Sequence, residues 1–295
     1  LALLHAPPPE LSVRDIQNGA LPAWQRLKFD ELLAQQLSMR LARQKRLSGR
    51  AAPIRGNQSL STPLLAALPF ALTAAQQRTL TEISHDLAQP HPMHRLLQGD
   101  VGSGKTIVAA LAALAAIEAG FQVAVMAPTE ILAEQHYLKV SQWLQPLGVR
   151  IAWLSGSLKK RAKDAAKADM ANGSTQLAIG THALFQDDVA FHNLGLVIVD
   201  EQHRFGVAQR LALKDKGADV HQLMMSATPI PRTLAMSFFA DLDVSVIDEL
   251  PPGRTPIKTK LVNNARRAEV EGFVRHTVAQ GRQVYWVCPL IEDSE

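Results

Sequence analysis

The sequence predicts an α/β fold with a mostly parallel sheet that helices cover on both faces. From Phe70 onward, short apolar segments alternate with helical segments through short connections, as expected of parallel strands joined by helices. The segment Leu196–Val199 is apolar at every position, which is typical of a strand with both faces buried. A glycine-rich turn at 99–104 joins an apolar segment to a helix, which is the arrangement of a phosphate-binding loop.

The first 69 residues differ in composition from the alternating part and are predicted to form a separate region, 1–69. Residues 1–22 are rich in proline and predict a linker or the edge of a preceding domain. Residues 24–50 combine apolar side chains at helical spacing with many basic ones, which predicts a solvated helix packed on the following domain. Direct contact of this helix with DNA is the alternative. Prolines and a glycine within 51–69 indicate irregular chain or short helix.

The alternating part, 70–250, is predicted to form the main domain. Its clearest helix is predicted over Thr106–Ala119, which is rich in Ala and Leu and is followed by Gly120. Strands are predicted at Arg95–Gln98, Gln122–Ala127, Arg150–Leu154, Gln176–Gly180, Leu196–Val199 and Gln222–Met225.

The run Pro251-Pro252-Gly253 marks a second boundary, beyond which 251–295 is predicted to begin another α/β domain. In this part we expect a strand ending at Val262, a helix over Asn264–Ala279 and a strand over Gln283–Cys288.

Composition and charge restrict the class of protein. With 295 residues and 47% hydrophobic content, the chain can bury one large core or two modest ones. A formal charge of +4 and a pI of about 9.3 are compatible with nucleic-acid binding but do not require it. The single cysteine excludes an internal disulfide framework and indicates a reducing compartment, and the apolar run Ile107–Ile117 is too short to span a bilayer. Because the chain begins at Leu1 without a signal pattern and stops at Glu295 just after an apolar segment, we expect an internal part of a longer protein.

The segment 99–106 carries the most specific motif. Gly99, Gly104, Lys105 and Thr106 match the phosphate-loop pattern G-x-x-x-x-G-K-[ST], in which backbone N–H groups surround a phosphate. Lys105 is expected to reach the β- and γ-phosphates of ATP, and the Thr106 hydroxyl is expected to bind Mg²⁺. An ordinary Gly/Ser-rich loop before a helix is the alternative. The expected nucleotide-binding residues of this loop are Gly99, Asp100, Val101, Gly102, Ser103, Gly104, Lys105 and Thr106.

Asp200 and Glu201 follow the apolar segment Leu196–Val199, at the end of a strand where an open α/β sheet places its ligand-binding groups. We assign Asp200 to Mg²⁺ and Glu201 to the general base that orients and deprotonates the attacking water. Taken alone, an Asp-Glu pair is more often a solvated turn. Its position after a phosphate loop favours the functional interpretation.

Other small polar residues follow predicted strands. Ser226 and Thr228 could link the carboxylate pair to neighbouring groups, although such residues are also ordinary turn formers. Gln76 could read the adenine edge while Phe70 stacks on the base, and a helix N-cap at Thr73 is the alternative. Residues suited to gripping sugar-phosphate, or equally to capping a helix, are Pro128, Thr129, Gly180, Thr181 and His182.

In the order of these motifs, the sequence resembles the motor of superfamily 2 DNA helicases with a DEAH/DEQH-type box. Among these helicases it resembles the RecG family of branched-DNA translocases. The resemblance covers nearly the whole chain. The motifs that carry it are the segments 99–106, 127–130, 180–182, 200–207, 226–234 and 248–254. The translocases that couple transcription to repair share the box and the run Thr228–Thr233, and they are the alternative relatives.

The resemblance implies a RecA-like P-loop NTPase lobe at 70–250, followed by the start of a second such lobe. It implies ATP and Mg²⁺ as cofactors, branched or duplex DNA as partner, and a monomeric motor in the bacterial cytoplasm at the nucleoid. Single-strand binding protein is a further partner that it suggests. Gln202 and His203 would join Lys105 and Glu201 in catalysis, Ser226 and Thr228 would couple nucleotide state to movement, and Arg232 would contact DNA. Which of His203, Arg204 and Arg232 senses nucleotide instead remains open.

The family's wedge domain and the later motifs of its second lobe, including an arginine finger, are absent from the sequence. We therefore expect the 295-residue chain alone to hydrolyse ATP poorly. Two other classes of protein are alternatives. A metabolic phosphate-loop kinase leaves the box at 200–203 unexplained, and a non-catalytic DNA-binding module rests only on the basic segment 24–50.

Overall fold

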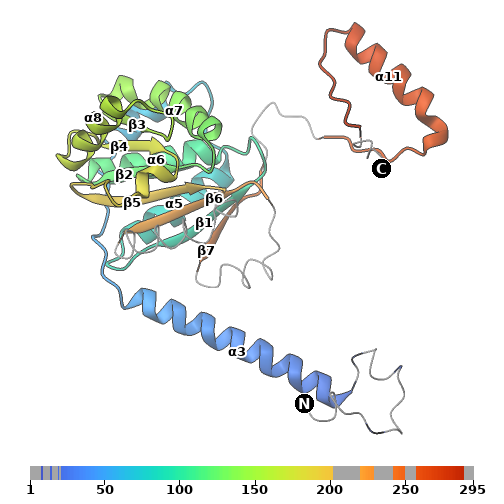
Figure 1. The fold of residues 1–295 in the computed structure, drawn as a ribbon, viewed down its shortest axis with the longest axis horizontal. Coiled ribbons are helices and arrows are strands. Elements are labelled where there is room, and N and C mark those ends of the chain that lie inside the picture. The colour runs from blue at the N-terminus through green and yellow to red at the C-terminus, as the bar shows by residue number, and fades with distance from the viewer. Residues whose placement is uncertain are drawn as a thin grey trace. The chain divides into compact units, whose positions relative to one another are not determined.

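The computed structural model describes residues 8, 14, 19, 21–201, 220–228, 242–249 and 257–288. The chain divides into two compact units, Leu1–Pro252 and Gly253–Glu295. The first unit contains a sheet with helices around it, and the described part of the second contains the α-helix α11 (Figure 1). None of the described helices has the length and apolar content that a membrane span requires.

A seven-stranded sheet forms the centre of the first unit, in the order β3-β4-β2-β5-β6-β1-β7. Every pair of neighbouring strands is parallel, so the predicted α/β fold is confirmed. All strands predicted between 95 and 225 are present, whereas β7 was not predicted, because a short alternating edge strand has a weak signal. The strands are β1 (His94–Gly99), β2 (Gln122–Met126), β3 (Ile151–Leu154), β4 (Leu177–Gly180), β5 (Leu194–Asp200), β6 (His221–Ser226) and β7 (Asp243–Ile247).

Two apolar clusters lie on opposite faces of this sheet. Along β2, Val123 and Val125 belong to one cluster, and Ala124 and Met126 belong to the other. This alternation shows that both faces are buried, as the uninterrupted apolar strands predicted. Helices α5, α6 and α7 contribute to the first cluster, and α8 and η2 contribute to the second. The helical segments around the sheet are α4 (Ser61–Ala67), α5 (Ala74–Leu87), α6 (Lys105–Glu118), α7 (Glu130–Leu144), η1 (Gln145–Leu147), α8 (Lys160–Ala171) and η2 (His182–Phe185).

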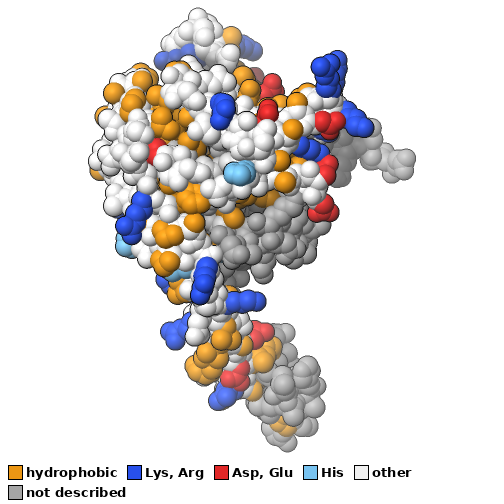
Figure 2. Space-filling model, turned by 90° about the vertical axis from the view of Figure 1, so that its left-hand side faces the viewer, with side chains coloured by type: hydrophobic (Ala, Val, Ile, Leu, Met, Phe, Trp, Pro, Cys, Tyr) orange, Lys and Arg blue, Asp and Glu red, His pale blue; other side chains and the backbone are white. Residues whose placement is uncertain are grey.

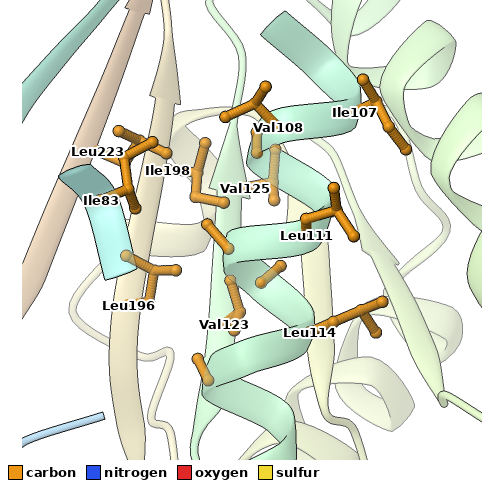
Figure 3. Packing of buried hydrophobic residues seen from close by; sticks show 14 of the residues in the cluster. Ile83, Ile107, Val108, Leu111, Leu114, Val123, Val125, Leu196, Ile198 and Leu223 are labelled. Atoms are coloured by element: carbon orange, nitrogen blue, oxygen red, sulfur yellow. The ribbon is translucent and has the colours of Figure 1, made fainter. Parts of the chain in front are cut away.

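Helix α6 is apolar almost all round and lies in the centre of the first cluster. Val108 and Leu114 have no exposed surface, and Figure 3 shows them in the same cluster as Val123 and Val125 of β2. A helix without a polar face has no solvent-facing orientation, so packing determines its position. The amino end of this helix follows the glycine-rich loop directly.

The chain order of the strands places a topological switch beside β1. From β1 the chain passes over β6 and β5 to reach β2, and it returns to β5 and β6 later. Ligands of open α/β sheets bind outside the carboxyl ends of the strands at such a point. The glycine-rich loop, Asp200 and Ser226 stand at or directly after the carboxyl ends of β1, β5 and β6.

The predicted basic helix is present as α3 (Pro22–Leu47), but most of its apolar side chains do not pack on the sheet. Leu32, Leu37 and Leu41 are more than half exposed. The end of α3 is attached to the sheet by Arg46, whose guanidinium donates to the carbonyl of His94 at 3.1 Å and to a carboxylate oxygen of Asp243 at 3.1 Å.

Basic side chains are not gathered into one patch on the face shown in Figure 2, where Lys and Arg are spread between apolar and acidic residues. Several are paired with carboxylates: Arg26 with Asp30 at 2.9 Å and Arg78 with Asp248 at 2.7 Å. The net charge therefore does not by itself mark a nucleic-acid surface.

In the second unit, the predicted helix is present as η4 (Asn264–Arg266) and α11 (Arg267–Ala279). The predicted strand over Gln283–Cys288 is wrong, because these residues form no ladder. Residues 257–263, the described part of the strand expected to end at Val262, are also irregular. An apolar segment becomes a strand only by pairing, and no described segment of this unit pairs with either one.

The carboxyl end of α6 is attached to the preceding segment through Glu118. Its carboxylate accepts hydrogen bonds from the backbone N–H groups of Gln58, Leu60 and Ser61 and from the Ser61 hydroxyl, at 2.8 to 3.0 Å. Burial raises the pKa of this carboxyl, but the hydrogen bonds outweigh burial and leave the pKa below its usual value.

We expect Glu118→Gln to lower the free energy of unfolding by about 1–2 kcal/mol at neutral pH, because one amide group cannot accept all of these bonds. Since the folded-state pKa is lowered, the wild-type advantage is present above the unfolded-state pKa and is lost as pH falls through the folded-state pKa. Urea unfolding at pH 7 and at pH 3 measures this, and an equal difference at both pH values would contradict it.

Two leucines provide a matched test of the core. We expect Leu114→Ala on α6 to cost about 2–5 kcal/mol of unfolding free energy, because the side chain is fully buried and leaves a cavity. Leu138→Ala on α7 should change it by less than about 0.5 kcal/mol, since that side chain is 62% exposed. Chemical denaturation of both variants compares them directly, and equal losses would show that the assigned core is wrong.

Candidate nucleotide-binding site

The glycine-rich loop connects β1 to α6 in a conformation that depends on its glycines. Gly102 and Gly104 have φ values of 78° and 91°, in the left-handed region. A Cβ atom on Gly104 would lie 2.2 Å from Nε2 of Gln76, and one on Gly99 would lie 2.5 Å from Oγ of Ser103. A side chain at Gly99 or Gly104 would therefore force Ser103 or Gln76 to move.

Lys105 stands at the first position of α6 and turns back over the loop. Its ammonium group donates to the carbonyl of Gly99 at 2.6 Å and to that of Asp100 at 3.0 Å. Burial lowers the pKa of Lys105, while the negative charges of Asp200, Glu201 and Asp100 act in the opposite direction. The two carboxylates predicted to work with the loop are thus near enough to act on its lysine electrostatically.

Glu201 is connected to the segment after β6. Its backbone has φ 47°, an uncommon value for a residue other than glycine, and its N–H donates to the carbonyl of Met225 at 2.9 Å. Its carboxylate accepts from the N–H of Ala227 at 2.9 Å and from the Ser226 hydroxyl at 3.4 Å. The hydroxyls of Ser226 and Thr228 are 2.9 Å apart.

The same segment contacts the strand that precedes the loop. Nε2 of Gln98 on β1 donates to the carbonyl of Thr228 at 3.2 Å. The structure therefore brings together the predicted base Glu201, the predicted coupling residues Ser226 and Thr228, and the strand that carries the loop. The roles assigned to them stay predictions.

Asp200 has a partner that the sequence did not indicate. Nε2 of His136 on α7 lies 2.7 Å from Oδ2 of Asp200, and each side chain is only 13% exposed. No motif spacing connects position 136 with position 200, because packing of α7 beside the sheet creates the contact. Only the tertiary structure could reveal it.

Gln76 acts as a structural link between α5 and the loop. Thr73 is the N-cap of α5, so the N-cap predicted as the alternative is present. The backbone N–H of Thr73 donates to Oε1 of Gln76 at 2.9 Å. Nε2 of Gln76 donates to the carbonyl of Ser103 at 2.8 Å. The contact of Gln76 with adenine stays a prediction, whereas its amide already bonds the phosphate loop.

A pocket of about 390 Å³ lies beside the loop. Phe70, which is 43% exposed, lines it together with Lys105, Thr106 and Trp143. Its mixture of aromatic side chains, loop backbone and ammonium groups is suited to a base, a sugar and phosphates. The predicted position of Phe70 near the nucleotide is compatible with this pocket.

The residues proposed to grip DNA lie after the neighbouring strands β2 and β4. The Thr129 hydroxyl caps α7 by accepting from the N–H of Leu132 at 3.3 Å, while Thr181 is buried and His182 is exposed. Gly180 serves packing, because a Cβ atom there would lie 1.9 Å from the carbonyl oxygen of Leu154. Pro128 is half-buried at the turn between β2 and α7. Gln202, His203, Arg204 and Arg232 lie outside the described residues.

The residues at this edge fit a magnesium-bound nucleotide triphosphate. The loop is a cradle that a Cβ atom would obstruct, and among the described residues the buried Ser103 hydroxyl has no hydrogen-bond partner. Thr106 and Asp200 supply oxygen atoms, the ligands that Mg²⁺ prefers. No cluster of three or more His, Cys, Asp or Glu side chains that could hold a metal ion occurs in the described part of the chain. Magnesium normally completes its coordination with phosphates and water, so this does not count against the fit.

A glycine-rich phosphate loop, a carboxylate pair and a parallel sheet together define a nucleotide-binding domain of the P-loop class. The family model described as DEAD/DEAH box helicase matches residues 73–237, more than half of the chain. The chain belongs to this family of ATP-using helicases.

Curated relatives resemble the chain over all or most of its length. ATP-dependent DNA helicase RecG of Escherichia coli (strain K12) is 54% identical over 300 residues, which cover 100% of this chain and 43% of the relative. RecG of Thermotoga maritima is 50% identical over 273 residues, covering 92% of this chain and 35% of the relative. The chain thus spans less than half the length of these relatives.

Solved structures of helicases also resemble the fold of this chain. A structure of RecG bound to a three-way DNA junction has a TM-score of 0.80 and 46% identity, and the match covers 91% of this chain and 36% of that one. The DUF1998 helicase MrfA bound to DNA has a TM-score of 0.56 and 16% identity over 78% of this chain and 36% of that one, which supports the fold alone.

Two glycines with similar backbone angles allow the effect of backbone strain to be distinguished from the effect of contact with the loop. Gly104 and Gly148 have φ values of 91° and 81°, but a Cβ atom on Gly148 would meet nothing within 4 Å. We expect each change to alanine to cost about 1–2 kcal/mol of unfolding free energy from backbone strain. Only Gly104→Ala should also displace Gln76 and weaken ATP binding by about 10-fold or more. Thermal unfolding and calorimetric ATP titration test this, and equal affinities in both variants would contradict it.

Proposed function

We propose that this chain carries the ATP-binding lobe of a motor that translocates on branched DNA, at forks and Holliday junctions, during recombination and repair. The observation that carries the proposal is the contact network that links Glu201, beside the phosphate loop, to the segment 226–228. A metabolic phosphate-loop kinase leaves this link unexplained. The 54% identity to RecG and the likeness to RecG bound to a three-way junction support branched DNA as the substrate.

In this proposal the phosphate loop binds the triphosphate through its backbone N–H groups, and Lys105 neutralises the phosphates after leaving the carbonyls that it now contacts. Thr106 and Asp200 would hold Mg²⁺, which when bound supplies positive charge that offsets the charge developing on the phosphates. Glu201 would orient the attacking water and accept its proton. Gln202 and His203 would complete the catalytic set.

Coupling to DNA would pass through Ser226 and Thr228. Because both the Ser226 hydroxyl and the Ala227 N–H bond the carboxylate of Glu201, any movement of that carboxylate during hydrolysis must alter this segment. DNA would be gripped at the ends of β2 and β4 by Pro128, Thr129, Gly180, Thr181 and His182, and by Arg232. We further propose that the whole protein acts as a monomer at the bacterial nucleoid and meets single-strand binding protein there.

ATP turnover by the full-length protein tests the function. We expect turnover to rise on addition of forked DNA and to rise less with linear duplex of the same length. Lys105→Ala should lower the stimulated rate roughly 100-fold or more, because it removes the main cation at the phosphates, and should leave the thermal unfolding temperature nearly unchanged.

DNA-stimulated turnover that survives in Lys105→Ala would overturn the assignment of the loop. Wild-type turnover that is indifferent to DNA would favour a kinase, and DNA binding without any turnover would favour a non-catalytic module. Equal stimulation by linear and forked DNA would favour the translocases that couple transcription to repair.

A further inference from the structure

His136 is a polar residue on α7 that the proposed reaction does not use. Its Nε2 donates to Oδ2 of Asp200 at 2.7 Å, and both side chains are only 13% exposed. A hydrogen bond to a charged group in such an enclosed place is stronger than one in water, and it restricts the rotamer of the carboxylate.

The contact joins two elements whose positions are already set by other contacts. Asp200 ends β5, whose register is set by parallel pairing with β2 and β6. His136 lies in the middle of α7, whose amino end is tied to the turn after β3 because Oε1 of Glu130 accepts from the N–H of Ser157 at 3.0 Å. Val140 and Leu144 of the same helix are buried in the main cluster, so α7 is fixed on both sides of position 136.

We propose that His136 is a positioning residue for the metal site, which holds Asp200 in the orientation that binds Mg²⁺. The proposal rests on the proposed function, since it requires that the protein bind a magnesium nucleotide at the loop. According to this proposal, α7, which begins directly after Thr129, contacts the metal-binding carboxylate of Asp200 directly. Groups that orient a metal ligand typically account for 10- to 100-fold in metal affinity.

Replacing His136 by amide side chains of two different lengths tests the proposal while keeping a polar side chain at this position. The nitrogen of a Gln side chain reaches about as far as Nε2 of His, whereas that of Asn reaches only about as far as Nδ1. We expect His136→Asn to raise the Mg²⁺ concentration needed for half-maximal ADP binding by about 10-fold, and His136→Gln to restore most of the wild-type value. Gln142→Ala, at an exposed position of the same helix, is the matched control and should behave as wild type.

The measurement is calorimetric titration of ADP into the full-length protein at a series of Mg²⁺ concentrations, with EDTA as the metal-free reference. ADP affinity in EDTA should be the same in all four proteins, and thermal unfolding records any general loss of stability. A purely structural role for His136 would lower the unfolding temperature in both amide variants without moving the Mg²⁺ requirement, and it would overturn the inference.

The remaining outcomes are also decisive. If the wild-type protein needs Mg²⁺ for tight ADP binding and His136→Asn needs no more, the inference fails while the proposed function stands. If His136→Gln and His136→Asn raise the Mg²⁺ requirement equally, the distance that the donor nitrogen reaches does not determine Mg²⁺ binding, and the inference fails again. If wild-type protein binds no nucleotide, or binds it without regard to Mg²⁺, both proposals fail.

Discussion

Strands β5, β6 and β1 are neighbours that run parallel and end at the same edge of the sheet, and the candidate site depends on their alignment. The register pairs Asp200 with Met225 and Gln98 with Ser226. This alignment lets Glu201 reach the segment after β6 and lets Gln98 reach Thr228. A slip by one residue would turn each side chain to the other face and separate the carboxylates from the loop.

The loop in turn relies on the burial of α6. This helix has apolar side chains on nearly all sides, so the sheet and its neighbouring helices fix it in place, and Glu118 secures its far end. A rigid helix holds its amino end, with its partial positive charge, at one point beside β1. The position of the glycine-rich loop thus depends on hydrophobic packing many residues away from it.

Polar contacts then fix the orientation of side chains and loops that hydrophobic packing has brought together. Gln76 connects the capped end of α5 to Ser103, and Glu201 is held at φ 47° by bonds on both its N–H and its carboxylate. Uncommon backbone angles of this kind persist where surrounding contacts determine them, and they occur often at functional sites. The contact of His136 with Asp200 belongs to the same group of side-chain interactions.

Local periodicity and fixed motif spacing were enough to predict the parallel α/β fold, the strands from β1 to β6, the helix behind the loop, and the loop and carboxylate pair. The sequence did not reveal β7, whose alternation is short, and it wrongly predicted a strand over Gln283–Cys288, because a strand exists only through its partner. The role of Gln76 as a tether, the packing role of Gly180 and the partnership of His136 with Asp200 were decided by the tertiary structure alone. Contacts between residues distant in the chain arise when packing sets the relative positions of helices and strands, and no local pattern in one sequence records those positions.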